Sequence, residues 1–340
     1  MQPGLSFEGV GGERMRQAGF TIVQDTTGWA TLGPFTALKN VPRLWRVMQR
    51  LVRRVVADPP DGIVLLDFGA FHVRFALALR QAGYTGPLLY GFPPSAWLDR
   101  PKVARCVAEL SVPLVAFGHQ RDFYASLGLP VRYFGHPLAS TILPRLPHER
   151  SAHGRFVFLP GSREQEICQH LPRMLAAIAL LKEQLPQAEC VVVAADSRLE
   201  RVFRERLPAG VAVERDARTW LAWADVACVA SGTAVLEAAL LEVPTVAIYA
   251  LSRLNAWIAR RMYRGKYVTL PNLVLDQAVV PELLQDAATP QAIAEQLLGL
   301  REDPQAQLQG LHALRSALGG RGALRAWAEY ALQLFAPTGA

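Results

Sequence analysis

The sequence predicts an α/β protein with two Rossmann-like domains, parallel sheets and a cleft between the domains. Short β-branched runs alternate with longer helical patterns along a chain of 340 residues, which is long enough for two cores. Two of these runs end in similar turns, LPGSR at 159–163 and ASGTAVLE at 230–237. Small residues and hydroxyls open a helix at each turn, where the first N–H groups lack intrahelical partners. The two turns together therefore indicate a bound diphosphate.

The order of the expected elements divides the chain into two halves. In the first half, strands are expected near residues 5–10, 62–67, 87–91, 112–117 and 131–134. The polar segment 144–154 has no periodicity and is interpreted as a linker. Strands then resume near residues 155–159, 190–194, 211–213, 225–230 and 245–249. The predicted units are a domain at 1–145, a domain at 146–318, and a final helical segment at 319–340 that crosses back or exchanges between subunits.

The composition is that of a globular protein, with 51% hydrophobic and 19% charged residues. Its formal net charge of +7 comes mostly from arginine and indicates an anionic partner. The N-terminus lacks a basic region followed by an apolar one, which argues against a signal peptide. The longest apolar stretch, 226–251, is interrupted by hydroxyl, acidic and proline residues and is not expected to span a membrane.

The cysteines and histidines predict no metal site. The cysteines lack CxxC and metal-ligand spacing, and we expect reduced core residues of a cytosolic protein at Cys106, Cys168, Cys190 and Cys228. Isolated histidines have no partners at metal spacing and are interpreted as structural or solvent-facing, among them His72, His119 and His136.

A basic, amphipathic helix is predicted at 41–56. Its apolar half carries Trp45 among aliphatic residues, and arginines fill the other half: Arg43, Arg46, Arg50, Arg53 and Arg54. One interpretation is a core-facing helix with a solvated basic face. The other is a helix that presents arginines and Trp45 to an anionic membrane surface. A second basic and aromatic stretch at 253–267 favours the membrane, and no nucleic-acid-binding motif is present.

Two single residues, Arg163 and Asp67, are candidates for chemistry. Arg163 stands at a helix start, where an anion would offset its unfavourable placement in the helix dipole; the alternative is a surface pair with Glu164 or Glu166. Asp67 ends an apolar strand, where a general base would face the cleft; the alternative is a helix cap.

The second turn offers several polar groups in one place. Ser231 is expected to cap the helix, Gly232 to let a ligand approach the backbone, and Thr233 to add a hydroxyl. Glu237 lies one helical turn after Thr233, where its carboxylate could accept both ribose hydroxyls. The alternative is an ordinary helix start with a solvated glutamate.

These motifs occur in an order that resembles the lipid-A-disaccharide synthase family. The resemblance covers nearly the whole chain and rests on GERMRQAGF near the start, Asp67, Phe123-Tyr124, Gly135-His136, LPGSR, ASGTAVLE and YVTLPNL at 267–273. It implies a GT-B glycosyltransferase with the nucleotide in the C-terminal domain. In that family UDP-2,3-diacylglucosamine donates its sugar, with inversion, to the 6-hydroxyl of 2,3-diacylglucosamine 1-phosphate, and UDP is released.

The resemblance also implies residue roles and surroundings. By position, Asp67 would be the general base and Arg163 would meet the UDP phosphates. Phosphate and ribose would be held by Ser231, Gly232, Thr233 and Glu237, and Asn272 would complete the nucleotide pocket. No metal or redox cofactor is expected. The family works at the inner face of the cytoplasmic membrane, which would give the basic helix its surface; a homodimer is also compatible with the resemblance.

The chain departs from the family pattern on the acceptor side. Family members open with a strand and an AGExSGD-like loop, whereas this sequence begins at the second strand; the absence of a central first strand is expected to leave an unpaired slot. A start upstream of Met1, a rearranged first domain or a strand from a partner would each explain this. Ala70 and His72 replace polar family residues, and FPPSAWLDR from Phe92 keeps Trp97 but loses polar positions.

These departures leave two alternative functions open. The first is a catalytically silent, membrane-associated UDP-sugar-binding homologue. The second is a different enzyme on the same scaffold, such as a UDP-N-acetylglucosamine 2-epimerase or a glycosyltransferase with another acceptor.

Overall fold

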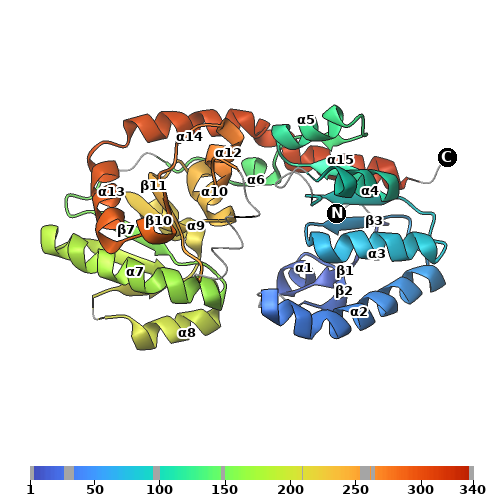
Figure 1. Cartoon of the computed structure of the whole chain (residues 1–340), viewed down its shortest axis with the longest axis horizontal. Helices are drawn as coiled ribbons and strands as arrows, with labels where there is room; N and C mark the ends of the chain where they lie inside the picture. The colour runs from blue at the N-terminus through green and yellow to red at the C-terminus, as the bar shows by residue number, and fades with distance from the viewer. Residues whose placement is uncertain are drawn as a thin grey trace.

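The protein consists of two α/β halves. The computed structural model describes residues 4–26, 34–94, 100–146, 150–208, 210–252, 261 and 265–336. Figure 1 shows the N-terminal half in blue and green beside a second half in yellow and orange, with the last helix, α15, lying on the N-terminal half. The strand pairs in these described residues are all parallel.

The described strands of the second half form one parallel sheet in the order β12-β11-β10-β7-β8-β9. Their bounds are β7 Arg155–Leu159, β8 Glu189–Val193, β9 Ala212–Glu214, β10 Val226–Ala230, β11 Thr245–Tyr249 and β12 Glu282–Leu284. Every residue of β10 is buried, because this central strand is covered on both faces. Its continuous apolar sequence is the pattern expected of such a strand.

Helices cover both faces of this sheet. Alternation along β7 sends Val157 to one core, with α10 (Thr233–Leu240) and α14 (Gln305–Ala317), and Phe158 to the other, with α7 (Glu164–Gln184) and α13 (Pro290–Glu302). The remaining described elements of this half are α8 Ser197–Arg206, α9 Ala217–Trp223, α12 Leu270–Leu275 and the 3₁₀ helix η2 Gln285–Ala287.

The described strands of the first half are divided between two sheets. A two-stranded sheet pairs β1 (Glu8–Gly11) with β2 (Thr21–Asp25). A four-stranded sheet has the order β3-β4-β5-β6, with bounds β3 Ile63–Leu66, β4 Leu88–Gly91, β5 Val112–Val115 and β6 Arg132–Tyr133. The helices of this half are α1 Glu13–Gln17, α2 Pro34–Ala57, α3 Gly69–Gln81, α4 Pro101–Leu110, α5 Gly118–Ser126 and α6 Pro137–Thr141.

Helix α2 joins the two sheets through one hydrophobic core. Val47 and Leu51 of α2 are buried in a cluster that includes Leu65 of β3, and Val10 of β1 packs against the same cluster. Arg54 of α2 also binds Glu8 of β1 at 2.7 Å. The two sheets are therefore connected by a helix rather than by a backbone ladder.

Strand β3 has a free edge on the side away from β4. The amide of Ile63 donates to Pro87 and that of Asp67 to Gly91, so by strand alternation the amides of Val64 and Leu66 point to the other side. No described strand pairs there. Val64 and Leu66 are 46% and 53% exposed, which is unusual for aliphatic side chains in a parallel strand.

The C-terminal helix α15 (Ala323–Phe335) packs against the first half of the same chain. Trp327 donates its indole N–H to the carbonyl of Gly135, and Tyr330 stacks under the guanidinium of Arg132. The short 3₁₀ helix η3 (Gly320–Gly322) lies just before α15. Immediately before η3, the chain passes the segment at Gly135-His136, and the amide of His136 donates to the carbonyl of Leu318. The chain therefore passes between its halves twice at nearly one point.

We predict that Gly319→Ala destabilises this crossing. Gly319 has a φ of +85°, and a Cβ there would lie 2.8 Å from the Cα of Gly135. The substitution should lower the free energy of unfolding by about 1–3 kcal/mol and reduce the Tm in a thermal melt. The control is Gly299→Ala in α13, where a Cβ meets nothing within 4 Å and helix propensity favours alanine. Equal Tm values for the two variants would contradict the prediction.

Candidate functional site

The two turns singled out in the sequence lie side by side. LPGSR follows β7 and ASGT follows β10, and these strands are neighbours in a parallel sheet, so both turns sit at one edge. A Cβ on Gly161, whose φ is +110°, would lie 3.6 Å from the Cβ of Ala230. Helices α7 and α10 start from these turns, and the positive ends of both helix dipoles are thereby brought to the same edge.

Arg163 stands at the N-cap of α7 and pairs with Glu166. Its guanidinium donates to Glu166 Oε1 at 2.8 Å, and its side chain is 64% exposed. The surface pair was one of the two interpretations of the sequence. An exposed pair of this kind contributes only about 0–1 kcal/mol, so it leaves Arg163 able to turn towards an anion.

The expectation that Ser231 caps α10 is wrong. The N-cap is Gly232, and no side chain accepts a hydrogen bond from the start of this helix. The extended backbone at Gly232 leaves Ser231 one residue outside the helix, where its amide donates to Ile248 of β11. Gly232 and Thr233 are exposed, so the helix start is open to an external acceptor.

Glu237 is already paired within the protein. Its Oε2 accepts from Arg218 Nε at 2.7 Å, and the carboxylate is 26% exposed. Arg218 lies on α9, which packs against α10. Sequence reasoning missed Arg218, because no local spacing connects it to Glu237. A ribose bound at Glu237 would therefore share this carboxylate with Arg218 or displace it.

Asn272 is buried, and its hydrogen bonds are made inside the protein. Its Nδ2 donates to Val280 and Glu282, and its Oδ1 accepts from the amides of Val279 and Val280. Both donors and both lone pairs of the amide are thereby used. Glu282 also accepts from Val268 and Thr269, so these residues tie the YVTLPNL segment to β12.

Asp67 occupies a strained turn at the end of β3. Asp67 and Phe68 both have left-handed backbone conformations, with φ of 51° and 46°. Such residues cost about 1–3 kcal/mol each and cluster at functional sites. Phe68 is the N-cap of α3 and no side-chain cap is present, so Asp67 does not play the capping role that the sequence left open. Its side chain is exposed.

Two side chains hold the backbone of this turn. The carbonyl of Asp67 faces His72 Nδ1 at 2.8 Å and accepts from the hydroxyl of Tyr90 at 3.0 Å. Because a carbonyl cannot donate, His72 must carry its proton on Nδ1. Burial lowers the pKa of His72 and raises that of Tyr90, so both groups stay neutral near pH 7. Sequence reasoning assigned no role to Tyr90 and interpreted His72 only as a structural or solvent-facing residue.

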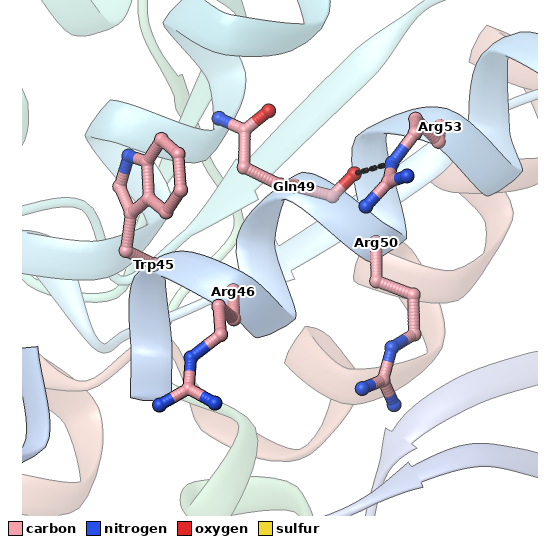
Figure 2. Close-up of a pocket in the computed structure, with 5 residues that line it drawn as sticks. All are labelled: Trp45, Arg46, Gln49, Arg50 and Arg53. Carbon is pink, nitrogen blue, oxygen red and sulfur yellow. Dashed lines mark hydrogen bonds between the residues drawn. The ribbon is translucent and has the colours of Figure 1, made fainter. Parts of the chain in front are cut away.

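The basic face of α2 is open to solvent. Figure 2 shows Trp45, Arg46, Gln49, Arg50 and Arg53 around a shallow pocket of about 320 Å³. Trp45 is 57% exposed although neighbouring apolar residues of α2 are buried, and Arg43 is also exposed. Arg54 differs because Glu8 neutralises it. We call Arg43, Trp45, Arg46, Arg50 and Arg53 the α2 basic surface.

The remaining sequence predictions concern Trp97, the stretch 253–267, membrane spans and the cysteines. Trp97 and most of the basic stretch 253–267 lie outside the described residues. None of the helices in the described part of the chain is long and apolar enough to cross a membrane. The cysteines form no disulfide; Cys190 and Cys228 are buried as predicted, whereas Cys168 is exposed on α7, because it falls on the outer face of that helix.

Comparison with known proteins identifies the family. The family model described as lipid-A-disaccharide synthetase matches residues 1–324. The chain belongs to the lipid-A-disaccharide synthase family. It is 35% identical to the lipid-A-disaccharide synthase of Hahella chejuensis over 92% of this chain and 84% of that one. It is 32% identical to the Synechocystis protein of the same name, over 97% and 89% of the two chains. The chain is thus a glycosyltransferase.

Solved structures show the same fold at low identity. The UDP-GlcNAc 2-epimerase of Neisseria meningitidis, bound to UDP-GlcNAc, gives a TM-score of 0.62 at 13% identity, over 94% of this chain and 87% of that one. The calicheamicin glycosyltransferase CalG4 gives 0.53 at 16% identity, over 95% and 89%. These likenesses confirm the predicted GT-B arrangement of two Rossmann-like domains.

We predict that Asn272→Ala destabilises the fold. The substitution leaves the buried amide of Val280 without an acceptor, whereas the amide of Val279 keeps the carbonyl of Gln277, and the free energy of unfolding should fall by about 1–3 kcal/mol. Chemical denaturation measures this change, and the exposed neighbour Gln277→Ala is the control. Wild-type stability of the Asn272 variant would show that the Glu282 and Asn272 contacts do not hold this segment.

Proposed function

We propose that the chain transfers 2,3-diacylglucosamine from its UDP derivative to the 6-hydroxyl of 2,3-diacylglucosamine 1-phosphate, with inversion and release of UDP. The observation that carries this proposal is the adjacency of the LPGSR and ASGT turns at one sheet edge in a member of this family. The UDP-GlcNAc bound by the Neisseria epimerase, a protein of the same fold, supports a UDP-sugar as the donor.

The donor half would bind UDP through helix starts and one arginine. The starts of α7 and α10 offer unpaired N–H groups and positive dipole ends to the diphosphate. Arg163 would leave Glu166 to meet the phosphates, while Ser231, Gly232 and Thr233 line the second turn. Glu237 would accept ribose hydroxyls beside Arg218, and Asn272 would act on the pocket only through the segment it holds.

The acceptor half would supply the base. Asp67 would take the proton of the acceptor hydroxyl while its oxygen attacks the anomeric carbon from the face opposite UDP. The new C–O bond forms as the bond to the UDP phosphate breaks, and the negative charge left on UDP is met by Arg163 and the helix starts. His72 and Tyr90 would keep the Asp67 turn in one conformation during this step.

The α2 basic surface would hold the enzyme at an anionic membrane. Both proposed substrates are acylated, and an exposed tryptophan among arginines is typical of interfacial helices. On this proposal, the protein works as a peripheral protein at the inner face of the cytoplasmic membrane. A homodimer is part of the same proposal, and its interface is not assigned to any residue.

A second function is favoured by one observation. The strand that precedes Asp67 lacks a partner on one side among the described residues, so the acceptor half is less supported than the donor half. A catalytically silent UDP-sugar-binding homologue would show this imbalance. Measured UDP binding without any disaccharide formation would select this alternative over the transferase.

We predict that Asp67→Asn removes turnover but not donor binding. Loss of a general base lowers the rate by about 10²–10⁴-fold, while the Kd for UDP, measured by calorimetry, should stay unchanged. The matched control is Asp61→Asn, an exposed aspartate just before β3. Undiminished turnover would remove Asp67 from the mechanism.

The reverse pattern is expected for Arg163→Ala. Loss of one charge-assisted contact to phosphate should raise the Kd for UDP by about tenfold or more. Arg201→Ala on α8 is the control, because this exposed arginine lies on a different helix. Equal UDP affinity in both variants would show that Arg163 keeps its pair with Glu166 in the complex.

We predict that reversing the α2 basic surface releases the protein from anionic membranes. Arg46, Arg50 and Arg53 changed together to Glu should lower binding to vesicles of phosphatidylglycerol and phosphatidylcholine, measured by flotation. Each basic residue contributes about 1 kcal/mol near such a surface, and the effect should shrink in high salt. The control removes an equal number of exposed arginines from α8: Arg198, Arg201 and Arg206. Equal flotation of both variants would place the membrane contact elsewhere.

A further inference from the structure

A buried histidine connects the two loops that flank the ASGT turn. His170 lies on α7 and is 0% exposed. Its Nδ1 is 3.0 Å from the carbonyl oxygen of Pro160, in the LPGSR turn. Its Nε2 is 3.0 Å from the amide nitrogen of Ala250, just after β11. Both ring nitrogens are therefore used, and each contacts a different loop.

The contacts fix the protonation of the ring. A carbonyl oxygen can only accept, and a backbone N–H can only donate, so Nδ1 carries the proton and Nε2 carries the lone pair. Only the neutral imidazole makes both bonds. A protonated ring would direct an N–H at the N–H of Ala250.

The two loops that His170 connects lie on either side of strand β10. In the sheet order β11-β10-β7, the two connected loops follow the strands on either side of β10. Strands separated by one other strand lie about 9–10 Å apart, which is too far for a direct backbone hydrogen bond. The imidazole spans this gap at the edge where ASGT leaves β10.

A second bond completes the connection. The amide of Ser231 donates to Ile248 of β11, two residues before Ala250. The LPGSR turn is therefore linked through His170 to the end of β11, and the end of β11 is linked to the ASGT turn. These contacts add a side-chain connection to the backbone ladder that already holds β7 beside β10.

We propose that His170 is a positioning residue of the donor site, which sets the distance between the LPGSR and ASGT turns and thereby the fit of the diphosphate. This inference rests on the proposed binding of UDP at those turns. In this role, His170 acts through the two loops and does not itself contact the ligand. The competing role is that of a core histidine that contributes to stability alone.

Two variants separate these roles. His170→Phe keeps a buried ring and removes both bonds, whereas His170→Gln keeps one N–H donor and one oxygen acceptor. We expect His170→Phe to raise the Kd for UDP about tenfold or more, and His170→Gln to stay within about threefold of wild type. Calorimetry measures binding, and a thermal melt of the same samples measures stability.

The outcomes are distinct. If the wild type binds UDP and His170→Phe binds it equally well, with only a lower Tm, then the residue is structural and the inference is wrong. If the wild type itself does not bind UDP, the proposed donor site fails, and the inference fails with it for that separate reason.

A pH series tests the inference even if His170→Phe does not fold. Burial lowers the pKa of His170; nearby Glu166 raises it and Arg173 lowers it, all on α7, and Tyr249 of β11 packs against the ring. The contribution of neutral His170 is present above the ordinary pKa near 6.5 and is lost as pH falls through its lowered value.

The comparison with His170→Gln removes the titration of UDP itself. Both proteins meet the same ligand at each pH, so the ratio of their Kd values reports His170 alone. We expect wild type to lose affinity relative to His170→Gln as pH falls through the lowered pKa of His170. A ratio that stays constant down to the lowest pH at which both proteins remain folded would contradict the inference.

Discussion

The parallel order β11-β10-β7 is the constraint on which the rest of the candidate site depends. Parallel neighbours need crossover connections, here made largely by helices that cover the faces of the sheet, and these bring every strand in with the same direction. The turns after β7, β10 and β11 must then share one edge. This strand order brings to one edge the turns that carry three residues far apart in the sequence: Arg163, Ser231 and Ala250.

The loops of the candidate site are held by different hydrogen bonds in the two halves. In the second half, the loops are held by hydrogen bonds from three side chains: buried His170, buried Asn272 and partly buried Glu282. In the first half, a strained turn at Asp67 is held by two side chains on one carbonyl. Its strand lacks a second neighbour in the described chain. The described loops of the donor edge are thus held by more side-chain hydrogen bonds than the Asp67 turn.

The fold of the second half was predictable because its signals are local. The runs at 155–159 and 245–249 are continuous and apolar, and the strands match the predicted bounds. Strand β2 at 21–25 and strand β12 at 282–284 were missed, because each includes polar residues and is only partly buried, and β12 has only three residues. Their identity depends on tertiary pairing, which a local pattern does not carry.

The site was predictable only in outline. The position of the two turns followed from the strand-to-helix pattern, but the pairing of Glu237 with Arg218 depends on how α9 meets α10. The cap at Gly232 rather than Ser231 depends on one backbone conformation. The bonds of His170 join segments 80 residues apart, and no spacing in the sequence signals them.

The free edge of β3 has a consequence for the behaviour of the protein in concentrated solution. Unpaired amides beside exposed Val64 and Leu66 form a template to which an extended segment of another molecule can add. Strand β1 has a register irregularity between Gly9 and Val10, the kind of bulge that blunts an edge, whereas β3 pairs regularly with β4. Pairing of this edge with an unlike segment of a second molecule is a heterologous contact, which does not close on itself and can extend into open chains of molecules. Among the described residues, four residues of one short strand thus offer a route for association in concentrated solution.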